Sequence, residues 1–279
     1  MTKDEGSSGS VSPTAHYTGQ TWVRNGLSHP KLDTWQGRLL HDILALPNMA
    51  SRALGGPSLD GLLLARHRII DSLLEDLIEG GVSQVIEVAC GMSPRGWRFS
   101  ERYGADLTYV EADLPPMARR KREALAQMDS LGEEHRVVDL DVLRDGGPGS
   151  LEALVETMDP ARGLAIVTEG LLTYFDQATV EALWARLAGA LRPFEPGAYL
   201  ADLRLGRAGL GESAFGLLLG AFVRGRVHSY PGGEAGAEQA LRAAGFKRAA
   251  LHGCDRHPAA AEVNGAAAVG MLSIIEAVA

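Results

Sequence analysis

Hydrophobic positions along the chain follow two alternating periods, and this alternation predicts an α/β protein. Residues Leu59–Glu79 carry apolar side chains at helical spacing, and Gly80 and Gly81 follow as a stop. Short β-rich runs and helical stretches then alternate up to Leu203. Repeated βα units predict a doubly wound, mostly parallel sheet with helices on both faces. The predicted strands are Gln84–Ala89, Leu107–Ala112, His135–Leu140, Leu164–Thr168 and Ala198–Leu203, and the predicted helices between them are Arg95–Tyr103, Pro115–Met128, Leu151–Met158 and Ala178–Leu191.

The amino-terminal part of the chain lacks this rhythm. Residues 1–14 are rich in glycine and serine and contain no apolar run, so we expect a disordered leader and not a secretory signal. Residues 15–57 have an irregular pattern with one helix, Thr34–Leu46, which Pro47 is expected to stop. We therefore expect a helical cap at 15–57 on a main domain at 58–279.

The carboxyl-terminal third departs from the βα order as well. Helices are predicted at Leu210–Val223 and Glu234–Ala244, and β-like runs at Lys247–His252 and Val269–Ile275. The two runs lie close together in sequence, as in a hairpin. They predict an antiparallel pair at one edge of the sheet.

The net charge and the lengths of the apolar runs argue against nucleic acid and membranes as partners. The chain of 279 residues has 27 basic and 35 acidic side chains, a net charge of −8, which is the wrong sign for a broad nucleic-acid surface. No stretch approaches the roughly 18 consecutive apolar residues that a membrane span needs. We expect a cytoplasmic protein that binds neither nucleic acid nor membrane, and its oligomeric state stays open.

Several kinds of catalytic site find no support in the sequence. The two cysteines, Cys90 and Cys254, form no metal or redox motif. No serine lies in a G-x-S-x-G elbow, and no pair of histidines has metal-ligand spacing. We therefore expect no metal, disulfide framework or hydrolase triad.

A turn of small residues directly follows the first predicted strand. Residues 87–96 read Glu-Val-Ala-Cys-Gly-Met-Ser-Pro-Arg-Gly, and such a turn lets the backbone approach a ligand at the carboxyl edge of the sheet. The segment departs from the dinucleotide fingerprint G-x-G-x-x-G because Ala89 replaces the first glycine. A pyrophosphate would therefore be poorly served here.

Carboxylates stand at the ends of the next three strands. Asp113 follows Gly91 by 22 residues, near the spacing of an acid that accepts both hydroxyls of an adenosyl ribose, and Glu111 points the same way. Asp139 is suited to an adenine amino group, and Glu169, or the backbone near it, to an ammonium group. Together these acids predict a site for a cationic ligand that contains adenosine.

Four ordered segments between about residues 60 and 205 resemble the leucine carboxyl methyltransferase family. They are Ala-Arg-His-Arg-Ile-Ile-Asp at 65–71, the turn from Glu87 to Arg98, Glu-Ala-Asp-Leu-Pro at 111–115 followed by Lys121, and Thr-Glu-Gly-Leu-Leu-Thr-Tyr-Phe at 168–175. The branch most similar is that of the polyketide-type, tetracenomycin-like O-methyltransferases, which esterify aromatic carboxylic acids. The family often has glycine and alanine where this chain has Ala89 and Cys90, and Asp-Thr where it has Ser93-Pro94.

The resemblance implies a Rossmann-like class I methyltransferase fold and the cofactor S-adenosyl-L-methionine. By position, Arg66 would grip the methionyl carboxylate, Gly91 would lie under the methionyl part, and Glu169 would face the amine. Asp113 would hold the ribose, with Asp139 and Leu140 flanking adenine. The expected cofactor-binding residues are Arg66, Glu87, Gly91, Glu111, Asp113, Asp139, Leu140 and Glu169.

Methyl transfer to a carboxylate needs no catalytic base, because the sulfonium is already activated and the carboxylate is already a nucleophile. A phenol would need help losing its proton, so carboxyl esterification is favoured. We expect a flat, anionic acceptor to enter between the cap and the segment Leu171–Phe175. The expected acceptor-binding residues are Tyr17, Trp22, Arg24, Tyr174 and Arg204.

Three other functions remain open from the sequence. The first is a phenolic O-methyltransferase of secondary metabolism. The second is an NAD-dependent oxidoreductase with Asp113 on the adenosine ribose, for which a fingerprint glycine is missing. The third is a non-catalytic protein that binds an adenosyl ligand, because positioning and binding use the same residues.

Overall fold

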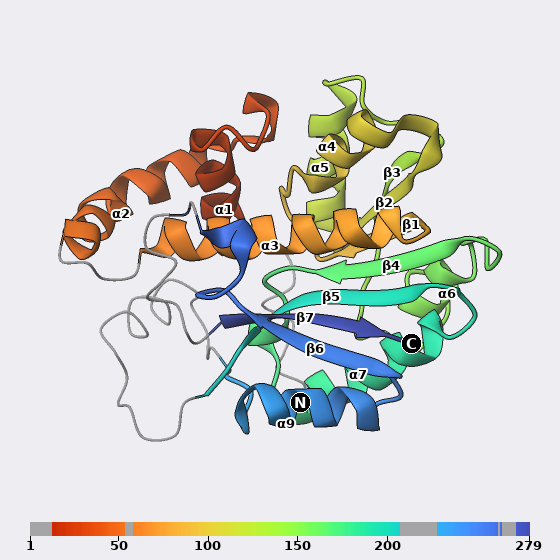
Figure 1. Ribbon diagram of the computed structural model, residues 1–279. Coiled ribbons are helices and arrows are strands. Elements are labelled where there is room, and N and C mark those ends of the chain that lie inside the picture. The colour runs from red at the N-terminus through yellow and green to blue at the C-terminus, as the bar shows by residue number, and fades with distance from the viewer. Residues whose placement is uncertain (1–12, 54–57, 207–227, 262, 264–271) are drawn as a thin grey trace, which may run out of the picture.

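The protein is built around a seven-stranded sheet (Figure 1). The computed structural model describes residues 13–53, 58–206, 228–261, 263 and 272–279. The strand order of the sheet is β3-β2-β1-β4-β5-β7-β6. The strands are β1 Val82–Val88, β2 Thr108–Asp113, β3 His135–Asp139, β4 Gly163–Thr168, β5 Gly197–Arg204, β6 Arg248–Gly253 and β7 Leu272–Val278. The five strands from β1 to β5 pair in parallel, as the βα repeats predict. The doubly wound, mostly parallel α/β fold is therefore confirmed.

The carboxyl-terminal edge is antiparallel. β7 inserts between β5 and β6 and runs antiparallel to both, with Tyr199 and Ala249 facing Ala277 in register. The predicted antiparallel edge is confirmed by β7 at Leu272–Val278, and residues 269–271 of the predicted run lie outside the described residues. The helix predicted at Leu210–Val223 lies outside the described residues.

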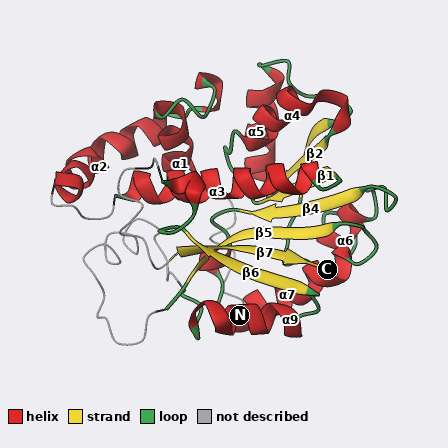
Figure 2. Ribbon diagram, in the orientation of Figure 1, coloured by secondary structure: helices red, strands yellow, loops and turns green. Residues whose placement is uncertain are grey.

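Helices cover both faces of the sheet (Figure 2). Strand side chains alternate between the faces, so that Val85 joins the core under α3 while Ile86 joins the core under α7. On the α7 side, Trp184 is fully buried at the centre of the larger core. The helices are α3 Leu59–Glu79, α4 Arg95–Tyr103 and α5 Pro115–Ala126 on one face, and α6 Leu151–Val155, α7 Gln177–Leu191 and α9 Gly233–Ala243 on the other, with short 3₁₀ turns η2 Gly104–Asp106, η3 Leu172–Tyr174 and η4 Pro258–Ala260.

The amino-terminal segment contains more helix than its sequence predicts. It forms α1 Pro13–Arg24, the 3₁₀ turn η1 Pro30–Leu32 and α2 Trp35–Ala53. The prediction that Pro47 ends the second helix is wrong, because α2 continues to Ala53. A proline removes one N–H from the helical ladder, and the hydrogen bonds on either side of that position can persist.

Contacts of α1 join this segment to the sheet domain. The Tyr17 hydroxyl donates to Asp60 Oδ1 at 2.6 Å, and the rings of Trp22 and His67 lie 4.7 Å apart between centroids. Both partners belong to α3. We therefore propose that residues 15–57 are a cap on the domain formed by residues 58–279 and not a separate domain. Within the described ranges, no helix combines the length and hydropathy that a membrane crossing requires.

Candidate functional site

The carboxyl ends of β1 to β5 bring the sequence-predicted acids to one edge of the sheet. Val88 pairs with Ala112 on one side and with Thr168 on the other, and Asp113 pairs with Asp139. The turn after β1, Asp113, Asp139 and the segment after β4 therefore share this edge. In open parallel sheets, ligands bind at this edge.

The turn after β1 has an unusual backbone. Ala89 and Gly91 have φ angles of +55° and +52°, in the left-handed region that favours glycine. Ala89 thus takes the conformation for which the missing fingerprint glycine is suited, at a cost of about 1 kcal/mol. A Cβ on Gly91 would lie 3.6 Å from the Cβ of Ala15 on α1, so the cap closely covers the turn.

Asp113 closes β2 beside this turn. Its Oδ2 accepts a hydrogen bond from Gly91 N at 2.8 Å, and its Oδ1 accepts from Leu114 N at 2.7 Å. Burial raises the pKa of Asp113, although these two amide hydrogen bonds oppose the shift. Each oxygen keeps a lone pair, so the carboxylate can still accept both hydroxyls of a diol.

Arg66 on α3 lies at the other end of the candidate site. Its Nε donates to Glu169 Oε1 at 2.9 Å and its Nη1 to Asp202 Oδ2 at 3.2 Å. The Nη2 atom makes no hydrogen bond to a described residue, and a Cβ on Gly170 would come within 3.1 Å of it. Because residue 170 is a glycine, no side chain crowds Nη2, and this atom can still donate to a carboxylate. Sequence reasoning missed Asp202, which lies inside β5.

Arg95 connects Arg66's partner Glu169 to two further acids. Its fully buried guanidinium donates at 2.6 Å to each of three carboxylates, those of Asp71, Glu87 and Glu169. Burial acts to raise the pKa of Glu169, but the charges of the basic groups around it outweigh burial and hold this pKa well below its usual value. Sequence reasoning missed this cluster, although Arg95 lies within the motif that it singled out.

The predicted role of Glu87 as a cofactor ligand is not supported by its position. The side chain is 1% exposed, with one oxygen bound to Arg95 and the other accepting from the Tyr109 hydroxyl at 2.8 Å. Glu87 therefore lies buried beneath the turn after β1, where its carboxylate pairs with Arg95. Its pKa is raised by burial.

Glu111 is likewise unsuited to a ribose. It points to the same face as Asp113, as the period of the strand requires, but it lies two residues deeper under α4 and α5 and has no exposed surface. Its carboxylate forms ion pairs with Lys121 and, at 2.8 Å, with His135 Nε2. Among these two acids, only Asp113 reaches the edge.

Asp139 and Leu140 follow β3 at the rim of the edge. The Asp139 side chain is 53% exposed and accepts from Arg122 Nη2 at 3.0 Å. Leu140 is buried, and its N–H donates to Asp113 O at 2.8 Å. Asp139 is accessible to a ligand, and the adenine-flanking roles of both residues stay predictions.

The cap residues expected to clamp an acceptor do not line an open site. Tyr17 and Trp22 are buried, at 0% and 4% exposure, between α1 and α3. Arg24 is exposed and forms an ion pair with Asp42 on α2 at 2.8 Å. The two aromatic side chains pack in the core, and Arg24 joins α1 to α2 at the surface.

The other two expected acceptor residues lie near the site. Tyr174 in η3 is 39% exposed. Burial acts to lower the pKa of Arg66, but Asp202, Glu169 and, to a smaller extent, Tyr174 raise it. Arg204 ends β5 two residues after Asp202, so both side chains point to the α3 face of the sheet. Burial alone lowers the pKa of Arg204, and no described carboxylate forms an ion pair with it.

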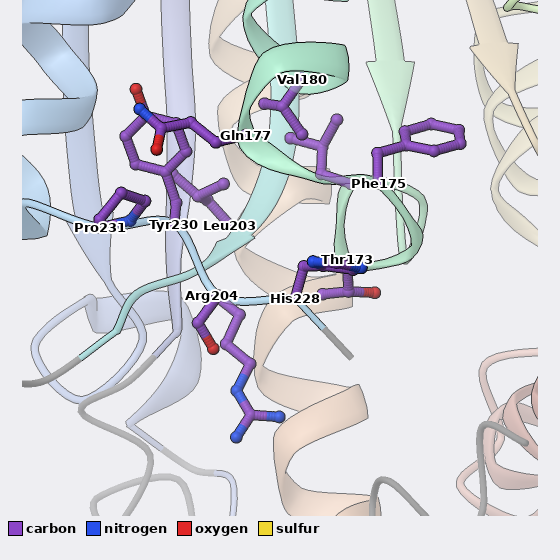
Figure 3. A pocket seen from close by; sticks show the side chains of 11 residues that line it. Thr173, Phe175, Gln177, Val180, Leu203, Arg204, His228, Tyr230 and Pro231 are labelled. Atoms are coloured by element: carbon purple, nitrogen blue, oxygen red, sulfur yellow. The ribbon is translucent and has the colours of Figure 1, made fainter. Parts of the chain in front are cut away.

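A pocket of about 240 Å³ opens on the opposite side of β5, beside η3 (Figure 3). Leu203 and Tyr230 give it an apolar wall, while the guanidinium of Arg204 extends away from Tyr230 and Val180. The lining residues are Leu172, Thr173, Phe175, Gln177, Val180, Leu203, Arg204, His228, Ser229, Tyr230 and Pro231. The part of the chain that the structure describes contains no cluster of three or more His, Cys, Asp or Glu residues that could hold a metal ion.

We expect the Arg95 cluster to set the acid limit of stability. Burial opposes ionisation of Asp71 and Glu169, but surrounding positive charges lower the pKa of both. Their stabilisation should be complete above the unfolded-chain value of about 4 and should decline as the pH falls through the lowered values. Urea unfolding at a series of pH values tests this, and Glu169→Gln should flatten the decline below pH 4. An equally steep decline in this variant would contradict the assignment.

Solved structures with the same fold include two that extend over nearly the whole chain. A DUF574 family protein from Streptomyces avermitilis has a TM-score of 0.64 at 15% identity, covering 94% of this chain and 97% of that one. A "putative methyltransferase" from Thermobifida fusca has a TM-score of 0.59 at 17% identity, covering 95% and 94%. At these identities the likeness shows the fold alone.

Sequence relatives align with a shorter region. A "Putative S-adenosyl-L-methionine-dependent methyltransferase" of Rhodococcus jostii is 33% identical over 146 residues, which is 52% of this chain and 47% of the relative. A protein of the same description from Streptomyces coelicolor is 32% identical over 125 residues, 45% of this chain and 43% of the relative. The alignments thus span about half the length of these relatives. The sequence model of the family described as "Leucine carboxyl methyltransferase" matches residues 27–188, more than half of the chain. The chain therefore belongs to the leucine carboxyl methyltransferase family.

Proposed function

We propose that the protein is an S-adenosyl-L-methionine-dependent O-methyltransferase that forms the methyl ester of a small aromatic or polyketide carboxylic acid. The observation that carries this proposal is the edge of the sheet that holds the Gly91 turn and Asp113, together with Arg66, whose Nη2 makes no hydrogen bond to a described residue. Family membership and the names of the relatives support the cofactor. So does a neighbour of the same fold, described as PigF with SAH, at a TM-score of 0.51.

The chemistry of the edge fits this cofactor. Asp113 offers acceptors for the ribose hydroxyls, Arg66 a donor for the methionyl carboxylate, and Asp139 an acceptor for the adenine amine. Three arginines and four carboxylates form a joined ion cluster beside this edge. Its members are Arg66, Arg95, Arg98, Asp71, Glu87, Glu169 and Asp202.

Glu169 has a different role in this proposal from the one expected from its sequence motif. Its side chain is only 4% exposed, with Oε1 bound to Arg66 and Oε2 to Arg95 and His67. The side chain therefore orients Arg66 toward the ligand, and the methionyl amine would meet the backbone near Glu169 instead.

The reaction requires positioning more than proton transfer. The bound cofactor supplies an activated methyl group. A carboxylate oxygen of the acceptor forms the new C–O bond as the S–CH₃ bond breaks, and no proton has to move. The protein's part is to hold the acceptor oxygen in line and to exclude water.

Arg204 is the residue that we assign to the acceptor carboxylate. Its guanidinium is half-buried, has no ion-pair partner among the described residues and lies on the sheet face of Asp202 and Arg66. A desolvated guanidinium forms strong two-pronged hydrogen bonds with a carboxylate. An anionic acceptor would therefore be held on the same face as the methionyl end of the cofactor.

Replacement of Asp113 tests the cofactor site. Asp113→Ala should weaken S-adenosyl-L-methionine binding by about ten- to a hundredfold, or about 1 to 3 kcal/mol, because it removes the acceptor for two hydroxyls. Asp113→Asn keeps an acceptor for one amide and should fall in between. Calorimetry with S-adenosyl-L-methionine and with NAD measures both variants and separates the oxidoreductase alternative. Unchanged affinity in Asp113→Ala would place the site elsewhere.

Replacement of Arg204 tests the acceptor. With 2-naphthoic acid and 2-naphthol as a matched pair, wild type should methylate the acid, and Arg204→Ala should lose about ten- to a hundredfold in kcat/KM because one charge-assisted hydrogen-bonding group is removed. Arg24→Ala is the matched control and should keep the wild-type rate, since Arg24 pairs with Asp42. An acid methylated at full rate by Arg204→Ala would refute this assignment while leaving the cofactor site untouched.

A phenolic acceptor is the second candidate, and His228 is the observation that favours it. This histidine lines the pocket beside η3, and its backbone N–H donates to Thr173 O at 2.9 Å. An imidazole there could accept the proton of a phenol. Methylation of 2-naphthol alone, lost in His228→Ala, would replace the carboxyl proposal with this one.

A further inference from the structure

We infer that Lys121 is a positioning residue that fixes the turn after β1 in the shape that meets the cofactor. This inference rests on the proposed function, because it concerns the same site. Lys121 lies on α5 and has no exposed surface. Its partners among the described residues are Ser93 and Glu111, and neither is Asp113 or Arg66. Its effect on a ligand would therefore pass through other residues.

The ammonium of Lys121 joins the turn to the strand below it. Nζ donates to Ser93 O at 2.5 Å and also forms an ion pair with Glu111 on β2. Ser93 lies two residues after Gly91 in the same turn. One buried cation thus connects the backbone of the turn to a carboxylate that the sheet holds in place.

Other hydrogen bonds also hold the turn, and Arg95, two residues after Ser93, donates to three carboxylates. At the start of the turn, Cys90 N donates to Ala112 O at 3.3 Å, and Ser93 N donates back to Cys90 O at 2.9 Å. The bond from Gly91 N to Asp113 at 2.8 Å lies between these points. Without Lys121, Ser93 O would lose the hydrogen bond that the described residues give it, and a buried carbonyl left unpaired favours a change of backbone conformation. Such a change would move Gly91 N–H away from Asp113.

Glu111 allows the positioning role to be separated from simple charge balance. Its other oxygen is 2.8 Å from His135 Nε2, so Glu111 keeps one partner when Lys121 is replaced. Lys121→Met would still leave a buried carboxylate without its main counter-charge, which lowers stability whatever Lys121 does for the turn. Glu111→Gln in the same chain removes that charge, and the amide can still form a hydrogen bond with His135 Nε2.

The test compares Lys121→Met with the double variant Glu111→Gln/Lys121→Met, using thermal unfolding and calorimetry with S-adenosyl-L-methionine. Lys121→Met should lower the Tm and raise the Kd about tenfold. The double variant should regain most of the lost Tm and keep the raised Kd, because Ser93 O still lacks its donor. At saturating cofactor, kcat and the KM of the acceptor should stay within about twofold of wild type. Lys247→Met, an exposed lysine before β6, is the control and should change neither Tm nor Kd.

Each result decides between the two roles. A double variant that regains both Tm and wild-type Kd would show that Lys121 only balances the charge of Glu111, and the inference would be wrong. If Lys121→Met does not fold, the double variant alone decides. A wild-type protein that binds no S-adenosyl-L-methionine would overturn the proposed function and this inference with it, whereas tight binding by wild type with equal Kd in every variant would overturn the inference alone.

Discussion

Arg95→Met should destabilise the protein by about 3 to 5 kcal/mol or prevent folding, because it removes the guanidinium that three buried carboxylates share. Asp71, Glu87 and Glu169 each accept from it at 2.6 Å. Methionine replaces the aliphatic stem of Arg95 but not its guanidinium, so the three carboxylates lose their shared counter-charge. Denaturant unfolding at pH 7 measures the change in the free energy of unfolding.

Two variants serve as controls, one at the same position and one elsewhere on α4. Arg95→Lys keeps the charge but replaces a fork of donors by a single ammonium, and it should lie between wild type and Arg95→Met. Arg102→Met removes an arginine that is 56% exposed and pairs with Glu75, and it should change stability by no more than about 1 kcal/mol. If Arg95→Met were as mild as Arg102→Met, the three buried carboxylates would not depend on Arg95 as their counter-charge.

The parallel part of the fold could be predicted from the sequence because each element carries its own signal. The bounds predicted for α3 and α4 match the structure, and the predicted strands differ from the observed ones by a residue or two. Helix α1 lacked such a signal, since its sequence PTAHYTGQTWVR contains threonine and glycine residues that favour a helix poorly. Packing against α3 through Tyr17 and Trp22 supplies what its own propensity does not.

The candidate site could be predicted only in part, for a physical reason. An acid near a strand end looks the same in the sequence whether it faces a ligand or a buried cation. Asp113 and Glu111 are two residues apart on one face, yet one is at the edge and the other is enclosed with Lys121. Arg95, Lys121 and Asp202 could not be paired with their acids, because the partners come from distant parts of the chain and meet only in the folded protein.

Gly96→Ala should destabilise the protein by about 3 kcal/mol or more, because there is no room for a methyl group at the start of α4. An ideal Cβ at this position would lie 2.4 Å from Glu111 Oε1 and 2.6 Å from its carboxyl carbon. Glu111 cannot move aside cheaply, since it is fully buried and paired with Lys121 and His135. The substitution thus combines overpacking with disruption of a buried ion pair.

Gly189→Ala is the matched control for that substitution. Gly189 is an exposed residue of α7, and a Cβ there would meet no atom within 4 Å. Alanine should therefore stabilise the protein by up to about 1 kcal/mol through helix propensity alone. Thermal unfolding of both variants should show Tm shifts of opposite sign. If Gly96→Ala raised the Tm as Gly189→Ala does, Glu111 would have to be free to leave Lys121, and the buried arrangement under the turn after β1 would be far looser than its contacts indicate. A combined Glu111→Gln/Gly96→Ala variant distinguishes the two costs, because a neutral amide relieves the charge but not the crowding, and a remaining loss of stability would measure the crowding.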